Sequence, residues 1–197
     1  NATTSRHITF LQGSTTLPSN SLAVGGSLIN SAPASFGFSH NGGTVKFNAG
    51  STGFSVSPAT STFYNLLFDS TSGGWTITQS ATSTNNTSIL NANSFTLASG
   101  ATLEVDGTFQ NLQGGAATTW TGSLLYLNGT SAYSINTKAA GSDAYGTVRI
   151  GNSASVSMWN SSAGSVLTGS GGYLYSQDHA AVDGDLYIYG NYSRSSG

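Results

Sequence analysis

The segment Leu103-Glu104-Val105-Asp106-Gly107-Thr108-Phe109 has the alternation of a β-strand followed by a glycine. Leu103 and Val105 are two positions apart, so both side chains project to one face of a strand, while Glu104 projects to the other. The same pattern, Leu-x-(Val/Ile)-x-Gly-x-(Leu/Phe/Tyr), recurs at residues 22–28 and 186–192. We therefore expect a protein built from repeats.

The repeat has a period of about 81 residues, since its three copies begin at Leu22, Leu103 and Leu186. Four other pairs of apolar positions follow nearly the same offset: Val45/Phe47 with Leu125/Leu127, Phe54/Val56 with Tyr133/Ile135, Leu66/Phe68 with Val148/Ile150, and Trp75/Ile77 with Val156/Met158. Five registers in the same order indicate tandem repetition. We predict one continuous domain over 1–197, with the tail of a first module (1–30) and two full modules (31–111 and 112–193).

Short alternating runs indicate an all-β fold. They recur roughly every 8 to 12 residues, separated by clusters of Gly, Ser, Asn and Thr, and no segment shows a helical stripe. The apolar positions persist from copy to copy while the residues between them vary, as stacked units require. We predict a parallel β-solenoid (β-helix), with three or four coils of roughly 20 to 27 residues in each module. Tandem β-sandwiches are the alternative, disfavoured because Gly-Gly and Asn-Gly turns precede loops of variable length rather than tight hairpins.

This alternation also predicts the core. Trp75 aligns with a core position and should be buried, whereas Trp120 and Trp159 should be freer. The residues predicted to point inward are Val45, Phe47, Leu103, Val105, Leu125, Leu127, Leu186 and Ile188.

Composition excludes several functions. Charged residues make up 6% of the chain, the formal net charge is −2, and Lys and Arg number five, so nucleic acid is not an expected partner. The chain has no cysteine, which excludes disulfides and cysteine-ligated metals. No apolar run approaches the roughly 20 residues of a membrane span, so no membrane insertion is expected. Hydrophobic residues at 37% and aromatic residues at 11% favour a packed fold over disorder.

Several compositional features predict an extracellular or cell-surface location. The chain is rich in Ser, Thr and Asn, lacks Cys, and begins at Asn1 without Met, as expected for a processed product or a fragment. It also contains acceptor sequons for N-glycosylation. Besides Asn1, the possible glycosylation sites are Asn85, Asn86, Asn128, Asn160 and Asn191.

Residues that could carry catalysis are sparse. Asp and Glu together number only 7. Glu104 and Asp106 share an outward face, which we interpret as solvated. Asp178, Asp183 and Asp185 lie close in sequence and could offer oxygen ligands to a hard cation, but no regular loop spacing supports a metal site. We therefore predict no catalytic residue, no metal and no cofactor. Lys46 lies between inward Val45 and Phe47 and should point outward. We therefore do not expect it to form a lysine–asparagine isopeptide bond, which requires a buried lysine.

The pattern running from residues 43–48, through 63–68, to 103–111 resembles the repeats of large bacterial and archaeal surface proteins and filamentous adhesins built as parallel β-helices. The resemblance covers most of the chain. It implies an extracellular, repetitive stalk or fibre and carries over no catalytic residue. The chain lacks the Gly-Gly-x-Gly-x-Asp ladders of calcium-binding nonapeptide solenoids, so calcium-dependent folding is not implied.

A structural fibre or stalk is the function that these observations favour. An open solenoid end exposes unpaired backbone groups, so the chain is expected to associate with itself, head to tail. One alternative is an adhesin module that binds cell-surface carbohydrate through Trp75, Trp120, Trp159 or tyrosines, and a second is a polysaccharide-cleaving β-helix. The predicted interface residues are Ile8, Phe10, Tyr173, Tyr175, Tyr187, Tyr189 and Tyr192.

Overall fold

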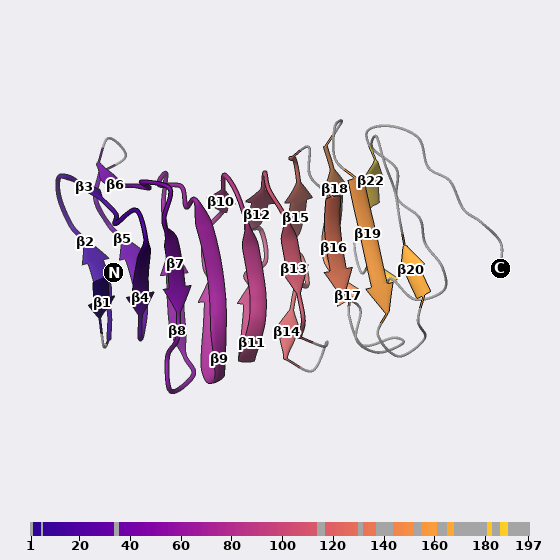
Figure 1. The fold of residues 1–197 in the computed structure, drawn as a ribbon, viewed down its shortest axis with the longest axis horizontal. Coiled ribbons are helices and arrows are strands. Elements are labelled where there is room, and N and C mark those ends of the chain that lie inside the picture. The colour runs from indigo at the N-terminus through magenta and orange to yellow at the C-terminus, as the bar shows by residue number, and fades with distance from the viewer. Residues whose placement is uncertain are drawn as a thin grey trace.

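The chain is a parallel β-solenoid, as predicted (Figure 1). The computed structural model describes residues 2–4, 6–33, 36–113, 117–129, 132–136, 144–151, 155–160, 165–167, 181–182 and 186–188. All regular secondary structure in these residues is β-strand, and the paired strands are parallel except β19 (Ser155–Asn160) with β20 (Ser165–Leu167).

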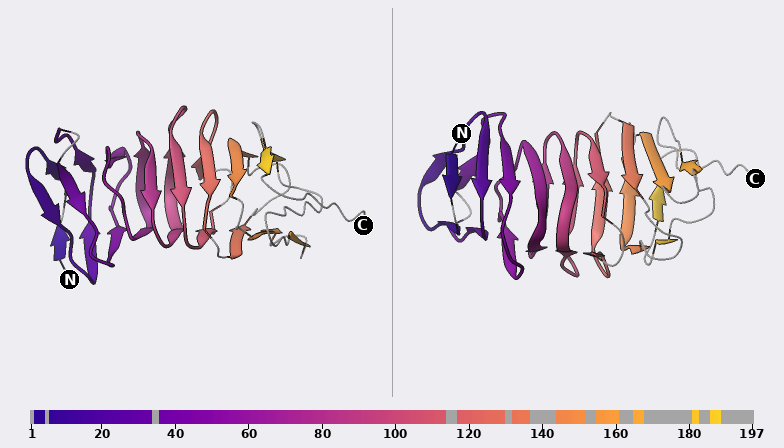
Figure 2. Two further views of the ribbon diagram at one scale, coloured as in Figure 1. Left: turned by 90° about the horizontal axis from the view of Figure 1, so that it is seen from above. Right: turned by 60° about the horizontal axis from the view of Figure 1, so that its bottom comes forward.

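The strands form three stacks, which we call faces 1, 2 and 3 (Figure 2). Face 1 contains β1 (Ala2–Thr4), β4 (Ser21–Val24), β7 (Thr44–Phe47), the first parts of β9 (Asn65–Ile77) and β11 (Thr87–Leu97), β13 (Phe109–Asn111), β16 (Ala132–Asn136), β19 and β20. Face 2 contains β2 (Ile8–Phe10), β5 (Leu28–Asn30), β8 (Phe54–Ser57), the last parts of β9 and β11, and β14 (Thr118–Thr119). Face 3 contains β3 (Ser14–Thr16), β6 (Gly37–Ser39), β10 (Ala81–Ser83), β12 (Thr102–Val105), β15 (Leu124–Leu127), β18 (Thr147–Ile150) and β22 (Leu186–Ile188). β17 (Ala144–Tyr145) pairs with β21 (Ala181–Val182).

Strand pairing gives the length of one coil. Leu22 pairs with Val45, Val45 with Leu66, and Leu66 with Thr87, so a coil contains roughly 21 to 23 residues. The coil between β5 and β8 is longer, because Leu28 lies beside Val56. The coils from Leu22 to Thr87 therefore have the length expected from the sequence, whereas the step from Leu28 to Val56 and that from Val148 to Leu186 are longer than expected.

The long sequence repeat does not coincide with a whole number of coils. Leu22 lies in β4 on face 1, whereas Leu103, its equivalent in the repeat, lies in β12 on face 3. Leu22 and Thr87 lie on face 1, three coils apart. From Thr87 the chain continues through face 2 to face 3, where Leu103 lies. Copies of the repeat are thus rotated onto different faces. The described strands do not test the division into modules, which stays a prediction.

The fifth position of the repeat is glycine because the backbone of the neighbouring coil lies very close to it, at the corner between two strands. A Cβ atom on Gly26 would collide with the carbonyl oxygen of Arg6, and one on Gly107 would collide with that of Asn85. The Gly107 amide donates a hydrogen bond of 2.8 Å to the same Asn85 oxygen. The corner therefore has room for glycine alone, and both copies use it against the coil beside them.

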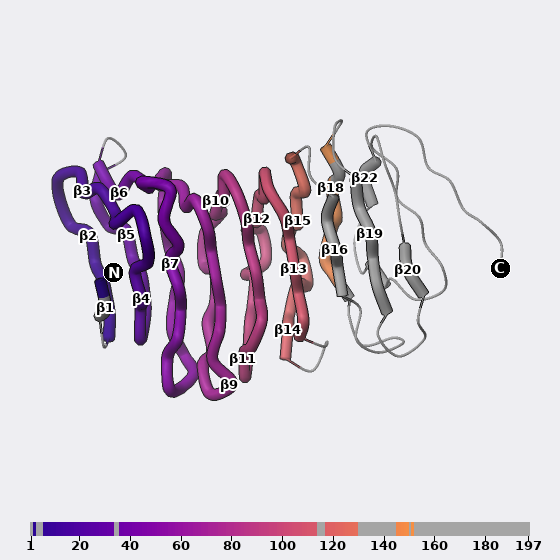
Figure 3. The backbone as a smooth tube through the Cα atoms, viewed as in Figure 1, coloured from indigo at the N-terminus to yellow at the C-terminus, as the bar shows by residue number. Residues whose placement is uncertain are grey.

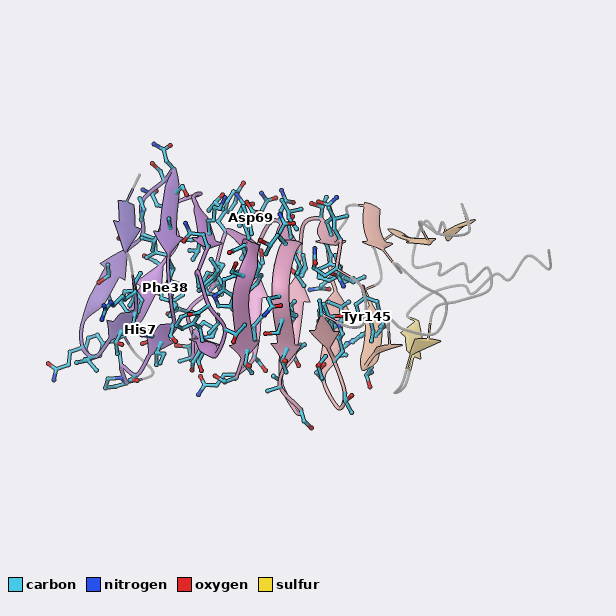
Figure 4. The ribbon with its side chains drawn as sticks, turned by 90° about the horizontal axis from the view of Figure 1, so that it is seen from below. His7, Phe38, Asp69 and Tyr145 are labelled. Atoms are coloured by element: carbon cyan, nitrogen blue, oxygen red, sulfur yellow. The ribbon has the colours of Figure 1, made fainter. Side chains whose placement is uncertain are left out.

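The interior of the solenoid is filled by packed side chains. Phe47 stacks on Phe68, Phe68 contacts Phe95, and Phe95 contacts Trp120, with ring centroids 5.0, 5.0 and 5.2 Å apart. Phe38 and Tyr145 lie among the strands in the same way (Figure 4). The predicted core residues with described side chains are all buried: Val45, Phe47, Leu103, Val105, Leu125 and Leu127. The side chains of Leu186 and Ile188 lie outside the described residues.

Trp75 is buried, as predicted, but the prediction for Trp120 is wrong. Trp120 is 2% exposed and packs between Phe95 and Tyr145, with ring centroids 5.2 and 5.0 Å away. Thr118 is buried and Thr119 exposed, so the alternation of β14 continues to Trp120 and turns it inward. The side chain of Trp159 lies outside the described residues.

Candidate functional site

The first coil of the described residues consists of β1, β2 and β3, and we call it the open coil. β1, β2 and β3 pair in register with β4, β5 and β6 on one side only, and no described strand pairs with their other side (Figure 3). As far as the described residues extend, the outer backbone groups of these strands form a short edge on all three faces. Such an edge can pair with a further parallel coil.

Two predicted interface residues belong to this open coil. Ile8 and Phe10 are half-buried and pack against the hydrophobic core, while Thr9 between them is exposed. The Phe10 ring lies 5.2 Å from that of Phe38 in the next coil. Leu11, which follows, is 66% exposed. The end of the core is therefore partly open to solvent, which a stacked coil would cover.

The other predicted interface residues cannot be compared with the structure. Tyr173, Tyr175, Tyr189 and Tyr192 lie outside the described residues. Tyr187 is placed only by its backbone, which pairs with Arg149 in β18. Their proposed role remains a prediction.

Face 3 carries a row of polar and aromatic side chains. Asn128 donates a hydrogen bond of 2.8 Å from Nδ2 to Glu104 Oε1 and accepts one of 2.7 Å from the Tyr126 hydroxyl. The Arg149 guanidinium lies 4.4 Å from the centroid of the Tyr126 ring. Glu104 is therefore linked to Asn128 in the next coil, and among the described residues it has no second carboxylate in hydrogen-bond contact.

A charged ladder crosses three coils at the edge of face 1. Lys46 Nζ forms an ion pair of 2.6 Å with Asp69 Oδ2, and Asn91 Nδ2 donates a hydrogen bond of 2.7 Å to Asp69 Oδ1. Asp69 lies at the outer edge of the stack (Figure 4). The hydrogen bond from Lys46, followed by that from Asn91, holds the pKa of Asp69 below its ordinary value. Lys46 points outward, as predicted, with 34% of its side chain exposed.

The described histidines have structural partners. His7 Nδ1 accepts a hydrogen bond of 3.1 Å from the Ser27 amide, and its ring packs edge-on against Phe54. His40 Nε2 lies 3.2 Å from Thr84 Oγ1, and its ring lies 5.5 Å from that of Tyr64. His40 also lines a hollow of about 380 Å³ together with Ser14, Phe36, Ser39, Thr60 and Thr62.

Three predicted glycosylation sites have side chains engaged in hydrogen bonds. Asn85 Nδ2 donates to Asn65 Oδ1 at 2.8 Å, and Asn86 Oδ1 accepts from the Thr108 amide at 2.9 Å. Asn128 Nδ2 donates to Glu104. A glycan replaces one of the two hydrogens on Nδ2, so modification of Asn85 or Asn128 would leave one N–H for these bonds. Asn1 and Asn191 lie outside the described residues, and Asn160 is placed by its backbone alone.

The weak metal-site candidates, Asp178, Asp183 and Asp185, all lie outside the described residues. Within the part of the chain that the structure describes, no three His, Cys, Asp or Glu side chains come close enough to hold a metal ion. Glu104 and Asp106 lie on the same strand and its adjoining turn, and both are partly exposed.

No protein family, curated protein or solved structure matches this chain. Among the described residues, no helix has the length and hydrophobicity needed to cross a membrane.

Proposed function

We propose that this chain is a structural β-solenoid element, a rigid segment of an extracellular fibre or stalk that lengthens by stacking coils end to end. The observation that carries the proposal is the open N-terminal coil. Its three strands keep the parallel register of the interior coils but, among the described strands, pair on one side only.

The hydrophobic core supports the same function. Interior residues such as Val24 and Leu28 are fully buried, whereas Ile8 and Phe10 in the end coil are only half-buried. Stacking a second copy on this end would bury Ile8 and Phe10 and satisfy the backbone edge. The contact would join different surfaces of the two copies, so it can repeat without closing and produce filaments. The partner surface that we propose is the opposite end of the solenoid, near β22.

The role of carbohydrate adhesin is less well supported. Trp75 and Trp120 are both buried and cannot stack on a sugar. Tyr126 is partly exposed, but the Arg149 guanidinium lies over its ring.

Substitution in β2 tests the proposal. Ile8→Lys and Phe10→Lys would place a charge on the inward side of the end coil, and Thr9→Lys would place the same charge on its outward side. We expect the unchanged chain to form rods or filaments in negative-stain images and a concentration-dependent mass in sedimentation. Ile8→Lys and Phe10→Lys should shift the chain toward monomers, while Thr9→Lys should leave assembly unchanged and all three keep their β-type circular dichroism. An unchanged chain that stays monomeric at high concentration would refute end-to-end stacking.

A further inference from the structure

Face 2 presents a row of hydroxyl side chains that the proposed function does not use. The strand registers align Ser55 with Thr76, Thr76 with Thr96, and Thr96 with Thr119. These four residues occupy consecutive coils, so their side chains follow the solenoid axis at the strand spacing of about 4.8 Å.

The hydroxyl row points away from the core. Thr76 lies between Trp75 and Ile77, which are 1% and 0% exposed, and is itself partly exposed. Thr96 lies in the same way between Phe95 and Leu97, which are both fully buried. No described residue forms a hydrogen bond with the hydroxyl of Thr76, Thr96 or Thr119. Each hydroxyl is thus available to donate one hydrogen bond and accept two from outside the chain.

The row is held rigidly. Behind it, Phe95 contacts Phe68 and Trp120, so the large side chains of successive coils fix the spacing of the strands. Threonine is branched at Cβ, which restricts χ1 and favours a common orientation of its hydroxyl along the row. The result is a single row of hydroxyls on a parallel sheet.

Face 2 is also the least charged of the three faces. Its described strand segments, residues 8–10, 28–30, 54–57, 74–77, 94–97 and 118–119, contain no Asp, Glu, Lys or Arg. The corresponding outward row on face 1 runs through Lys46, Leu67, Ser88 and Gln110, and that on face 3 runs through Thr82, Glu104, Tyr126 and Arg149. Among these described rows, only that of face 2 combines a single chemical group with a regular spacing.

We infer that face 2 binds the surface of ice. A charged side chain orders water around itself in a pattern that does not fit a crystal, whereas a neutral row of evenly spaced hydroxyls can hold water molecules at a constant repeat. The strand spacing of about 4.8 Å is close to the shorter oxygen repeat on a prism face of hexagonal ice. Since the scaffold fixes the hydroxyls in advance, little conformational entropy is lost when they join the lattice.

Growth of a single ice crystal in a solution of the purified chain tests this inference. The unchanged chain is expected to hold a crystal at constant size below its melting point and to give it facets. Thr96→Tyr, which raises a bulky ring from the middle of the row, should abolish both effects. Ser88→Tyr is the matched control, because Ser88 lies on the same strand, β11, but faces outward from face 1. It should retain the activity of the unchanged chain.

Thr96→Val keeps the shape of the side chain but removes its hydroxyl, and it should weaken the arrest of ice growth. Thr96→Ser keeps the hydroxyl and should arrest growth more strongly than Thr96→Val. Circular dichroism melting establishes that each variant is folded. If the unchanged chain leaves ice growth and crystal shape as buffer does, the inference is wrong. It is also wrong if Thr96→Tyr stays as active as Ser88→Tyr, or if face 2 instead mediates binding to crystalline cellulose or chitin in a sedimentation assay. Because Thr96 is remote from the open coil, these outcomes are independent of end-to-end stacking.

Discussion

Phe47 and Phe68 stack with ring centroids 5.0 Å apart and ring planes 11° apart, which joins two successive coils of the core. Phe68 also contacts Trp75 at 5.5 Å and Phe95 at 5.0 Å. One ring therefore connects the coils on either side of it. In a stack whose units contact only their neighbours, such a residue should control how cooperatively the coils unfold.

Replacing Phe68 with Ala should lower the free energy of unfolding by about 3–5 kcal/mol, because it leaves a cavity at the centre of this aromatic cluster. Leu67→Ala is the control, since Leu67 is the adjacent, outward residue and is only half-buried. Its effect should be about 1 kcal/mol or less. Guanidinium unfolding followed by circular dichroism measures both changes. Equal losses for the two variants would contradict the inward assignment of Phe68.

The corner glycine gives a second prediction. In Gly107→Ala, the new Cβ would collide with the Asn85 carbonyl oxygen, so two backbone segments must separate and the 2.8 Å hydrogen bond between them must lengthen. We expect a loss of about 1–3 kcal/mol in the free energy of unfolding. At Gly50, a Cβ would meet nothing within 4 Å and φ is not in the left-handed region, so Gly50→Ala should be neutral or slightly stabilising. Thermal melts of the two variants provide the comparison.

The sequence predicted side-chain direction better than it predicted which coils lie together. Alternation at Val45, Phe47, Leu103 and Val105 identified buried positions because each side chain in a strand has only two directions. The same rule would have buried Trp120 had residues 118–119 been recognised as a strand. Their polarity concealed that strand.

Lateral contacts need the coil length, which the long repeat conceals. Lys46 meets Asp69, and Asp69 meets Asn91, only because each pair is separated in sequence by one coil. Leu22 and Leu103 are equivalent in the repeat but lie on different faces. Aligning the sequence at the repeat period therefore does not show which side chains contact one another. The hydroxyl row of face 2 was missed for the same reason. Its signal was the recurring threonine between two apolar residues, as in 75–77 and 95–97.

The Lys46–Asp69–Asn91 ladder should make stability depend on pH. The hydrogen bond from Lys46 places the folded-state pKa of Asp69 below its ordinary value of 3.8, so folding is favoured while Asp69 is ionised. This contribution is complete above the unfolded-state pKa and is lost as the pH falls through the folded-state pKa. Asp69→Asn should therefore flatten the acidic part of a melting temperature profile between pH 7 and pH 2. Lys46→Gln combined with Asp69→Asn should cost less than the sum of the single changes.

Buried Asn111 supports the last prediction. It is fully buried, donates a hydrogen bond of 3.0 Å from Nδ2 to the Tyr145 hydroxyl, and accepts one of 3.0 Å at Oδ1 from the Gln113 amide. Asn111→Leu keeps the branching of the side chain but removes both hydrogen bonds, so we expect a loss of about 1–3 kcal/mol for the Gln113 amide alone.

Asn111→Asp tests the burial of this side chain. The carboxylate would still accept from Gln113, but its charge would be buried, so burial should raise its pKa above the ordinary aspartate value. A raised folded-state pKa destabilises the protein above the unfolded-state pKa, and this penalty should shrink as the pH falls until the introduced carboxyl group is protonated in both states. The melting temperature of Asn111→Asp should therefore approach that of the unchanged chain in acid, whereas Asn111→Leu should stay lower by a similar margin at every pH. Parallel profiles for the two variants would show that the side chain at this position is solvated, contrary to its complete burial in the structure.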